Sequence, residues 1–266
     1  MIILSKKETN LKKNGFSYYP KLLSKTEINR FFESTLDLLN FYNDEKKKFI
    51  NFDDIKLTNY ILNKKKSDTK FIKYLYNSLP HFSSLINLFE NKKIRHIASK
   101  ILNEKPSNLI ICEHQLRIDY PKDTNFILKA HQDSSFYPQD GSTRQSLVCN
   151  ISLHNITANM GSTILYKNSH ISGNLSYNKK FSHSKKRSTQ RQIKEKKLDN
   201  FKEITIETKP GDVSFYDMNL IHRSGVNISK KIRFSIIARI FNPLHDKFRT
   251  FQKISKIIKW KNIIKF

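Results

Sequence analysis

The chain has few of the residues on which several specialised classes of protein depend. Among its 266 residues are two cysteines, six glycines, seven prolines and one tryptophan. Two cysteines are too few for a disulfide framework or a four-thiolate zinc site, and so little glycine and proline excludes a collagen-like or low-complexity chain. No run approaches eighteen apolar residues, and residues 1–14 lack the apolar core of a secretory signal. We therefore expect a cytoplasmic protein with no transmembrane segment.

Acidic residues are also scarce, with 23 Asp and Glu against 49 Lys and Arg, which gives a net charge of +26. Such an excess suits a nucleic-acid or anionic-membrane partner, because lysines that neutralise phosphates release counterions. However, Lys, Asn and Ile are abundant along the whole chain, which indicates a compositional bias without a binding role. The sequence has no zinc-finger pattern and no RNA-recognition signature, so we expect no specific nucleic-acid partner.

The hydrophobic pattern predicts a single domain with a helical part over 1–105, a β core over 106–243 and a basic C-terminal helix over 244–266. The 38% of hydrophobic residues is enough for a packed core. Ser24-Lys-Thr-Glu27 has the form of a capping box, and the apolar residues after it follow helical spacing to Leu39. A second helical pattern covers about 81–102, whereas the Lys-rich stretch 44–70 is expected to be a loop.

Short runs of alternating or β-branched residues dominate the second half of the chain. Several short strands separated by turn signals are typical of a barrel or sandwich, which the preceding helices would cover. We expect strands over 109–120, 145–153, 162–166, 204–207, 213–216 and 232–241. The segment 179–197 has nine basic residues and little periodicity, so it is expected to be a long loop between strands.

Three residues form a candidate metal site. His131 and Asp133 are two positions apart, so on a strand both side chains would leave the same face and could share one ion. The pair alone is a weak signal, because a His-x-Asp pair arises easily by chance. His222, which ends the run that begins at Gly211, is the best third ligand. Two His and one carboxylate form the facial triad of non-haem Fe(II) oxygenases, but the same donors also bind zinc.

The strand after His222 has one mixed and one wholly apolar face. If the apolar face packs on the helices, two arginines point into the barrel, and a buried guanidinium needs an anionic partner such as a carboxylate. Ser224 could add a hydroxyl donor. The alternative is that the arginines lie on a solvated face. The mixed face has Arg233, Ser235, Ile237 and Arg239, and the apolar face has Phe234, Ile236 and Ala238.

The order and spacing of these motifs resemble the phytanoyl-CoA dioxygenase family of Fe(II)/2-oxoglutarate oxygenases. The likeness covers about 109–242. It rests on His131-x-Asp133, Asn159-Met-Gly-Ser-Thr-Ile-Leu-Tyr-Lys-Asn-Ser169-His170, Lys209-Pro-Gly211-Asp212, His222-x-Ser224 and Arg233. Asn168 departs from the family's usual Gly-Ser-His, which affects a turn.

The resemblance implies a mainly β fold with flanking helices, a jelly roll or double-stranded β-helix of cupin-like form. His131, Asp133 and His222 would be the metal and catalytic residues, with Fe(II), 2-oxoglutarate and O2 as cofactor and cosubstrates. Arg233 and Ser224 would bind the distal carboxylate of 2-oxoglutarate. Gln115-Leu-Arg117 matches a Gln-x-Arg pair of relatives such as ectoine hydroxylase, so Arg117 and Gln115 are further cofactor-binding candidates.

The expected reaction is hydroxylation of a small molecule with release of succinate and CO2. In halogenating relatives the position of Asp133 is a small residue, so the intact carboxylate favours hydroxylation. The basic segment 179–197 would suit an anionic substrate, either phosphorylated, nucleotide-linked or CoA-linked, or a glycan precursor, although compositional bias explains the same lysines. Two alternatives stay open: a catalytically silent jelly roll that binds a metal or ligand, and a basic nucleic-acid-binding protein.

Overall fold

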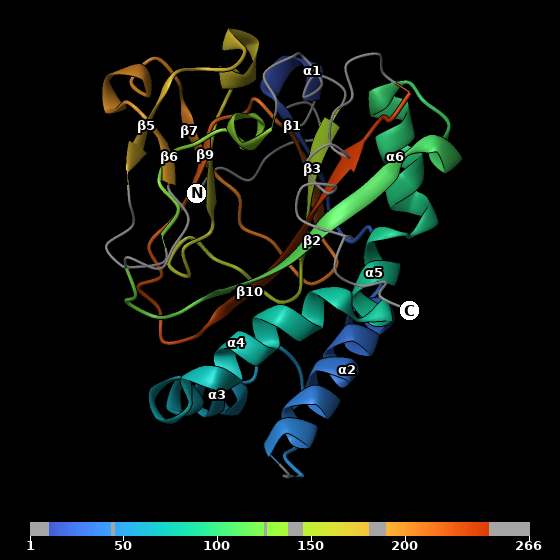
Figure 1. The fold of residues 1–266 in the computed structure, drawn as a ribbon, viewed down its shortest axis with the longest axis vertical. Helices are drawn as coiled ribbons and strands as arrows, with labels where there is room; N and C mark the ends of the chain where they lie inside the picture. Colours follow the sequence, from blue (N-terminus) through green and yellow to red (C-terminus); the bar gives the residue numbers. More distant parts are fainter. Residues whose placement is uncertain (1–10, 44–45, 125–126, 138–145, 181–189, 245–266) are drawn as a thin grey trace, which may run out of the picture.

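The computed structural model describes residues 11–43, 46–124, 127–137, 146–180 and 190–244 (Figure 1). The α-helices are α1 (Leu11–Asn14), α2 (Lys25–Asn43), α3 (Ile55–Ser67), α4 (Thr69–Ser78), α5 (Ser83–Phe89) and α6 (Lys92–Leu102). The strands are β1 (Phe16–Tyr19), β2 (Ile110–Asp119), β3 (Ser146–Ser152), β4 (Thr163–Tyr166), β5 (Tyr177–Lys180), β6 (Gln190–Ile193), β7 (Glu203–Thr205), β8 (Val213–Asp217), β9 (His222–Ser224) and β10 (Arg233–Phe241). Among these residues, no helix is both long enough and apolar enough to cross a membrane.

The capping residues explain where the N-terminal helices begin. The predicted capping box before α2 is confirmed, because the Ser24 amide donates to Glu27 Oε2 at 2.6 Å and the Glu27 amide donates to Ser24 Oγ at 3.2 Å. The prediction of a loop over 44–70 was wrong for most of its length. Asp54 caps α3 and Asp68 caps α4, since each carboxylate accepts from the first backbone amides of its helix. The pattern over 81–102 contains two helices, and Asn91 caps the second.

All the strand pairs are antiparallel, and they form two principal sheets. The larger sheet has the order β1-β8-β3-β10-β2, and a three-stranded sheet has the order β7-β4-β9. The six predicted strands are therefore confirmed, with ends that differ by one or two residues. Short strands β1 and β9 were missed. The predicted loop over 179–197 was wrong at both ends, because β5 pairs with β6 and a 3₁₀ turn follows at Glu195–Lys197.

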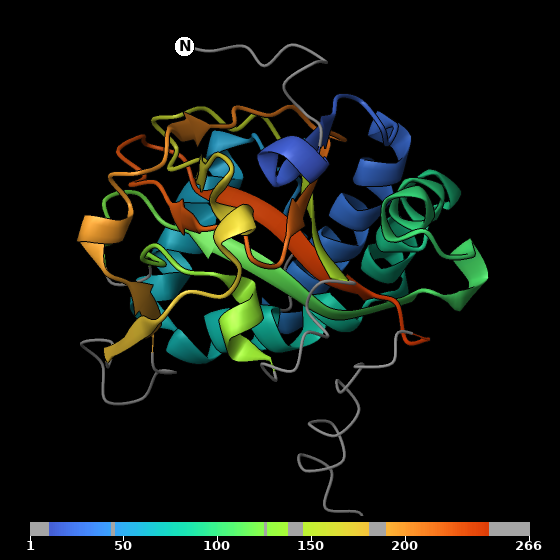
Figure 2. The same ribbon diagram turned by 90° about the horizontal axis from the view of Figure 1, so that it is seen from above.

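The helices cover one face of the five-stranded sheet, and the smaller sheets lie on its other side (Figures 1 and 2). The main hydrophobic cluster joins helix residues such as Phe31 and Leu85 to Phe234, Ile236 and Ala238 of β10. A second cluster joins the two principal sheets, with Val148 and Tyr216 from the larger and Leu165 from the smaller. The apolar face of β10 thus packs on the helices, as predicted, and its mixed face lies between the sheets.

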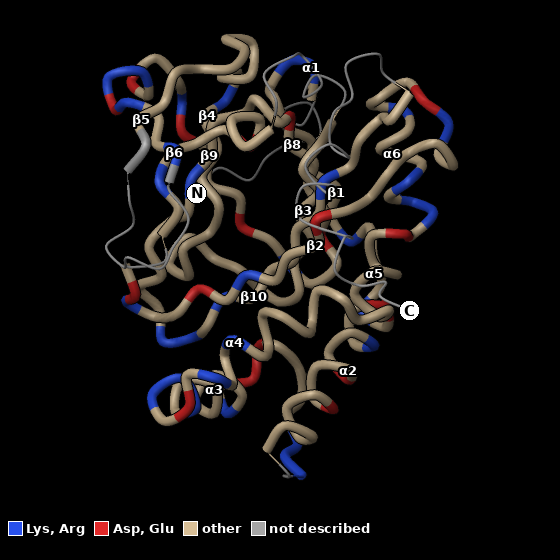
Figure 3. Tube along the Cα trace, viewed as in Figure 1, with Lys and Arg blue, Asp and Glu red and all other residues tan. Residues whose placement is uncertain are grey.

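Lys and Arg are distributed over elements at opposite ends of the molecule, including α1, α3, α6 and the chain around β6 (Figure 3). The predicted basic C-terminal helix over 244–266 lies outside the described residues, except for Leu244. The middle of the basic segment, 181–189, also lies outside them.

Candidate metal centre

His131 and His222 are held together by the backbone. Each donates its amide to the carbonyl of the other at 3.0 Å, so the pair forms an antiparallel bridge between two distant parts of the chain. The ring centroids lie 4.3 Å apart. The backbone itself therefore brings these two predicted ligands to one place. His222 begins strand β9.

Asp133 completes the group at the start of a 3₁₀ turn, Asp133–Phe136. One of its carboxylate oxygens, Oδ1, lies 3.4 Å from His131 Nε2 and 3.6 Å from His222 Nε2. One ligand atom from each of the three side chains falls within 4.8 Å of the other two. The structure therefore brings together all three ligands that were predicted from sequence.

The hydrogen bonds of both imidazoles fix the nitrogen that is free for a metal. His131 Nδ1 donates to the Lys129 carbonyl at 2.7 Å, and His222 Nδ1 donates to the Leu220 carbonyl at 3.0 Å. A carbonyl oxygen only accepts, so in a neutral ring the proton sits on Nδ1 and the lone pair on Nε2. Burial and the nearby His131 lower the pKa of His222 to about 4, which keeps its ring neutral at neutral pH. These donors fit a divalent ion, because metal-bound histidines are oriented in this way.

Gln132 anchors the segment between the first two ligands. Its side chain is fully buried. The amide nitrogen donates to the Gly173 and Asn219 carbonyls at 2.8 and 2.6 Å, and its oxygen accepts from the Leu175 amide at 2.8 Å. Three hydrogen bonds from one buried side chain fix the backbone, so His131 and Asp133 keep their common direction.

Ser169 and Asn168, which belong to the motif over 159–170, support His222. Ser169 is fully buried, and its hydroxyl accepts from the Ile221 amide at 2.8 Å, one residue before His222. Asn168 has φ +67°, a left-handed conformation that glycine adopts freely and that asparagine tolerates better than most residues. The departure from Gly-Ser-His therefore keeps the turn.

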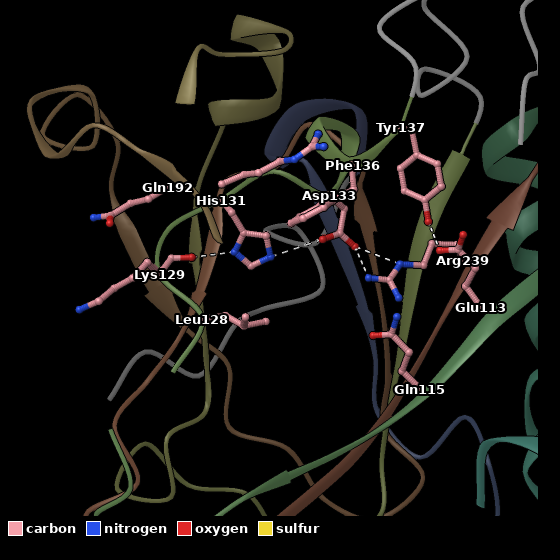
Figure 4. Close-up of a pocket in the computed structure, with 11 residues that line it drawn as sticks. Glu113, Gln115, Leu128, Lys129, His131, Asp133, Phe136, Tyr137, Gln192 and Arg239 are labelled. Carbon is pink, nitrogen blue, oxygen red and sulfur yellow. Dashed lines mark hydrogen bonds and ion pairs between the residues drawn. The ribbon is translucent and has the colours of Figure 1, made fainter. Parts of the chain in front are cut away.

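Arg239 holds the second oxygen of Asp133, a contact that was not predicted from the sequence. Its Nε and Nη2 donate to Asp133 Oδ2 at 3.1 and 2.8 Å (Figure 4). Burial alone would raise the pKa of Asp133, but the guanidinium and the two imidazoles hold that pKa well below its usual range. Asp133 is therefore ionised, with Oδ1 directed to the histidines and Oδ2 engaged by Arg239.

Arg233 and Arg117 lie together beside the group and share one carboxylate. Arg233 is 3% exposed, and its Nε and Nη2 donate to Asp119 Oδ2 at 2.9 and 2.6 Å. Arg117 Nη2 donates to Asp119 Oδ1 at 2.7 Å and lies 3.4 Å from Ser224 Oγ. Burial opposes ionisation of Asp119, but the two guanidiniums lower its pKa to about 2. Asp119 was missed, although alternation after Gln115 and Arg117 places it on their face of β2.

Two cavities meet at the candidate ligands. The smaller, about 70 Å³, is lined by the triad and by Arg117, Ser224 and Arg233. Tyr216 also lines it, and burial raises the pKa of Tyr216 to about 12, so its hydroxyl stays protonated at neutral pH. The larger cavity, about 290 Å³, opens in front of His131 and Asp133. Gln115 lines both cavities, so every predicted site residue borders the space around the candidate ligands.

Two imidazoles and a carboxylate, buried between antiparallel sheets and open to a cavity, are the donor set of the non-haem iron enzymes. The family comparison agrees with this class. The family model described as phytanoyl-CoA dioxygenase (PhyH) matches residues 11–235, and the chain belongs to that family.

Several solved structures have a similar fold. The carbocyclase SnoK from nogalamycin biosynthesis, described as non-heme and alpha-ketoglutarate-dependent, has a TM-score of 0.59 at 15% identity and covers 90% of this chain and 85% of its own. The epimerase SnoN, in complex with Fe³⁺, alpha-ketoglutarate and nogalamycin RO, has a TM-score of 0.55 at 13% identity, with 87% and 80% covered. EvdO2 from Micromonospora carbonacea var. aurantiaca, complexed with 2-oxoglutarate, has a TM-score of 0.57 at 13% identity, with 89% of each chain covered. A search of curated proteins found no match.

Proposed function

We propose that this protein is an Fe(II)/2-oxoglutarate-dependent dioxygenase that hydroxylates a small molecule. The observation that carries the proposal is the convergence of His131, Asp133 and His222, with both Nε2 atoms directed at one carboxylate oxygen. The balanced reaction takes substrate, 2-oxoglutarate and O2 to hydroxylated substrate, succinate and CO2. Bound iron supplies the redox chemistry of O2 and of oxidative decarboxylation, and the protein supplies orientation and a water-poor site.

Charge balance supports the binding of 2-oxoglutarate in the smaller cavity. Arg117 and Arg233 together have two positive charges, and Asp119 neutralises only one of them. A carboxylate beside these guanidiniums would complete the balance in a buried setting, where an uncompensated charge is costly. Ser224 and Tyr216 add hydroxyl groups to the lining of the same cavity. We therefore assign the distal carboxylate of 2-oxoglutarate to Arg233, Arg117 and Ser224, and place Gln115 at the junction with the larger cavity.

Arg239 orients the Asp133 carboxylate in the metal-free protein. Because Arg239 occupies Oδ2 of Asp133, the other oxygen is the one presented to an ion. A carboxylate that binds through one oxygen leaves more positions of the ion open to cosubstrates. The presence of Asp133 itself favours hydroxylation, since the halogenating relatives have a small residue there.

The remaining features of the proposal concern architecture and substrate. The two principal sheets, joined by the second hydrophobic cluster, support a double-stranded β-helix core within one domain. A reducing compartment such as the cytoplasm suits the two free cysteines, Cys112 and Cys149. The larger cavity is the proposed substrate site. Two basic side chains on its wall, Lys129 and Arg191, favour a small molecule with an anionic group.

Anaerobic reconstitution with Fe(II) and 2-oxoglutarate tests the proposal directly. We expect the metal-to-ligand charge-transfer absorption of the chelate and, after O2 is admitted, release of succinate. His131→Ala and Asp133→Ala should abolish both signals. His96→Ala, which changes an exposed histidine on α6, is the matched control and should leave both unchanged. Absorption without any succinate would indicate the silent metal-binding alternative, and absence of the absorption in the unmodified protein would refute the proposal.

A further inference from the structure

The larger cavity has groups of opposite charge on its two sides. Figure 4 shows Lys129 and Gln192 on one side of His131, and Glu113 with Tyr137 on the far side of Asp133. The candidate ligands lie between the two sides. A molecule that fills the cavity therefore meets a basic side, the metal centre and an acidic side in that order.

The acidic side is built around a distorted backbone. Glu113 has φ +54°, which is uncommon for a residue with a side chain. It lies where the pairing of β2 with β10 shifts register, between the pairs Gln115–Ile237 and Cys112–Arg239. Bulges of this kind redirect side chains near active sites, and a backbone conformation that costs energy indicates a functional constraint. The bulge turns the Glu113 carboxylate toward the cavity.

Glu113 accepts a hydrogen bond from Tyr137 and shares its nearby cation, Arg239, with Asp133. The Tyr137 hydroxyl donates to the Glu113 carboxylate, and burial and that carboxylate raise the pKa of Tyr137, so the phenol remains a neutral donor. Arg239 also lines this side, but its Nε and Nη2 donate to Asp133. Among the described residues, Glu113 forms no salt bridge. Arg239 is the nearby cation, and its one positive charge faces two carboxylates, Asp133 and Glu113. An ammonium group in the cavity would therefore supply the second positive charge.

The basic side is fixed in place by aromatic rings and by a backbone hydrogen bond. The guanidinium carbon of Arg191 lies 4.9 Å from the ring centroid of Phe136 and 5.1 Å from that of Tyr177. The Ile193 amide donates to the Ala130 carbonyl at 2.8 Å, which attaches strand β6 directly beside His131. Within the described part of the chain, neither Arg191 nor Lys129 is paired with an acidic residue. Arg191 is thus preorganised for an oxyanion.

We propose that the larger cavity binds a zwitterionic small molecule, with its ammonium group at Glu113 and its oxyanion at Arg191 and Lys129. This proposal rests on the function proposed above, and it names the class of the hydroxylated substrate. The two charged ends would fix the molecule at both sides, so that a C–H bond between them faces the metal centre. The oxyanion can be a carboxylate or a phosphate, because a guanidinium binds both through paired hydrogen bonds.

Spectroscopic titration of the anaerobic Fe(II)–2-oxoglutarate complex tests this proposal without turnover. The probes are 4-aminobutanoate, 6-aminohexanoate and 8-aminooctanoate, with hexanoate and hexylamine as singly charged analogues and 6-aminohexyl phosphate as the phosphate form. The readout is the dissociation constant from the shift of the charge-transfer band. We expect at least one amino acid of the series, or the phosphate form, to bind about tenfold more tightly than either singly charged analogue. The better of the two forms identifies the oxyanion.

Two variants test which residue binds each charged end of the zwitterion. Glu113→Gln should weaken zwitterion binding about tenfold and leave hexanoate unchanged, whereas Arg191→Gln should weaken the zwitterion and leave hexylamine unchanged. Glu104→Gln and Lys197→Gln, which lie outside the cavity lining, are matched controls and should bind like the unmodified protein. Equal affinity for all the probes, no binding of any probe, or unchanged zwitterion binding in Glu113→Gln would overturn the inference. Absence of the charge-transfer band would refute the proposed function. A band that is present but shows no preference for zwitterionic probes would refute only this inference.

Discussion

The buried ion pair of Arg239 and Asp133 leads to a prediction about the stability of the metal-free protein. Arg239 is 8% exposed and Asp133 3% exposed, and two hydrogen bonds join them. Arg239→Met removes the guanidinium and keeps an unbranched apolar side chain. The Asp133 carboxylate would then be buried beside the two imidazoles without the guanidinium that compensates its charge.

The size of the effect follows from the burial of the charge. Breaking a buried ion pair by removing one partner costs about 3–5 kcal/mol, because the remaining charge is not compensated. The double variant Asp133→Asn with Arg239→Met removes that charge and should recover most of this loss. A divalent ion restores the missing positive charge. At the same ion concentration, metal should therefore stabilise Arg239→Met more than the unmodified protein. For either protein, a thousandfold excess of ion over its dissociation constant adds about 4 kcal/mol to the free energy of unfolding.

Urea unfolding at neutral pH, first with a chelator and then with Mn(II), measures both the loss of stability without metal and the gain with metal. Arg223→Met is the control, since the Arg223–Glu203 pair lies at the surface and such pairs contribute less than about 1 kcal/mol. The reasoning would be refuted if the free energy of unfolding of metal-free Arg239→Met stayed within about 0.5 kcal/mol of the unmodified value. A double variant less stable than the single variant would refute it equally.

Three further predictions concern the carboxylate subsite and the turns. Arg233→Gln should raise the dissociation constant for 2-oxoglutarate at least tenfold while Fe(II) binding is retained, as measured by anaerobic titration. The pKa of Asp119 falls on folding from 3.8 to about 2, so the protein should lose about 2 kcal/mol of stability as the pH falls from about 4 to about 2, and Asp119→Asn should not show this loss in urea unfolding. Gly211→Ala should be much more destabilising than Gly173→Ala in thermal unfolding. Both glycines have positive φ, but only at Gly211 would the new Cβ lie 2.2 Å from the Leu23 carbonyl oxygen. Equal losses for the two alanine variants would contradict this.

The strands and the candidate ligands were predictable because each has a local signal. Alternation in Arg233–Phe241 placed the arginines on one face and the packing residues on the other, and the structure confirms both. His131 and Asp133 also lie on a common side, although Asp133 begins a 3₁₀ turn and does not continue a strand. The short His-x-Asp motif and the family resemblance identified these residues without knowledge of any long-range contact.

The remaining features depend on long-range contacts or on weak signals. Helix α3 was missed because lysines surround its few buried residues, among them Leu57 and Ile61, and outweigh their helical spacing. Asp119 was overlooked as the partner of two arginines because it belongs to another strand than Arg233. The bulge at Glu113 arises from a register shift between strands, which the sequence of one strand does not show.

The backbone bridge between His131 and His222 also has a consequence for the order of folding. The two residues come from distant parts of the chain, so we expect them to meet only after the intervening strands have been placed. Contacts of such high sequence separation form late, since the entropy of closing the loop must first be overcome. We therefore expect the complete donor set to form only with the last long-range contacts, and ion uptake during refolding would mark the final assembly of the sheets.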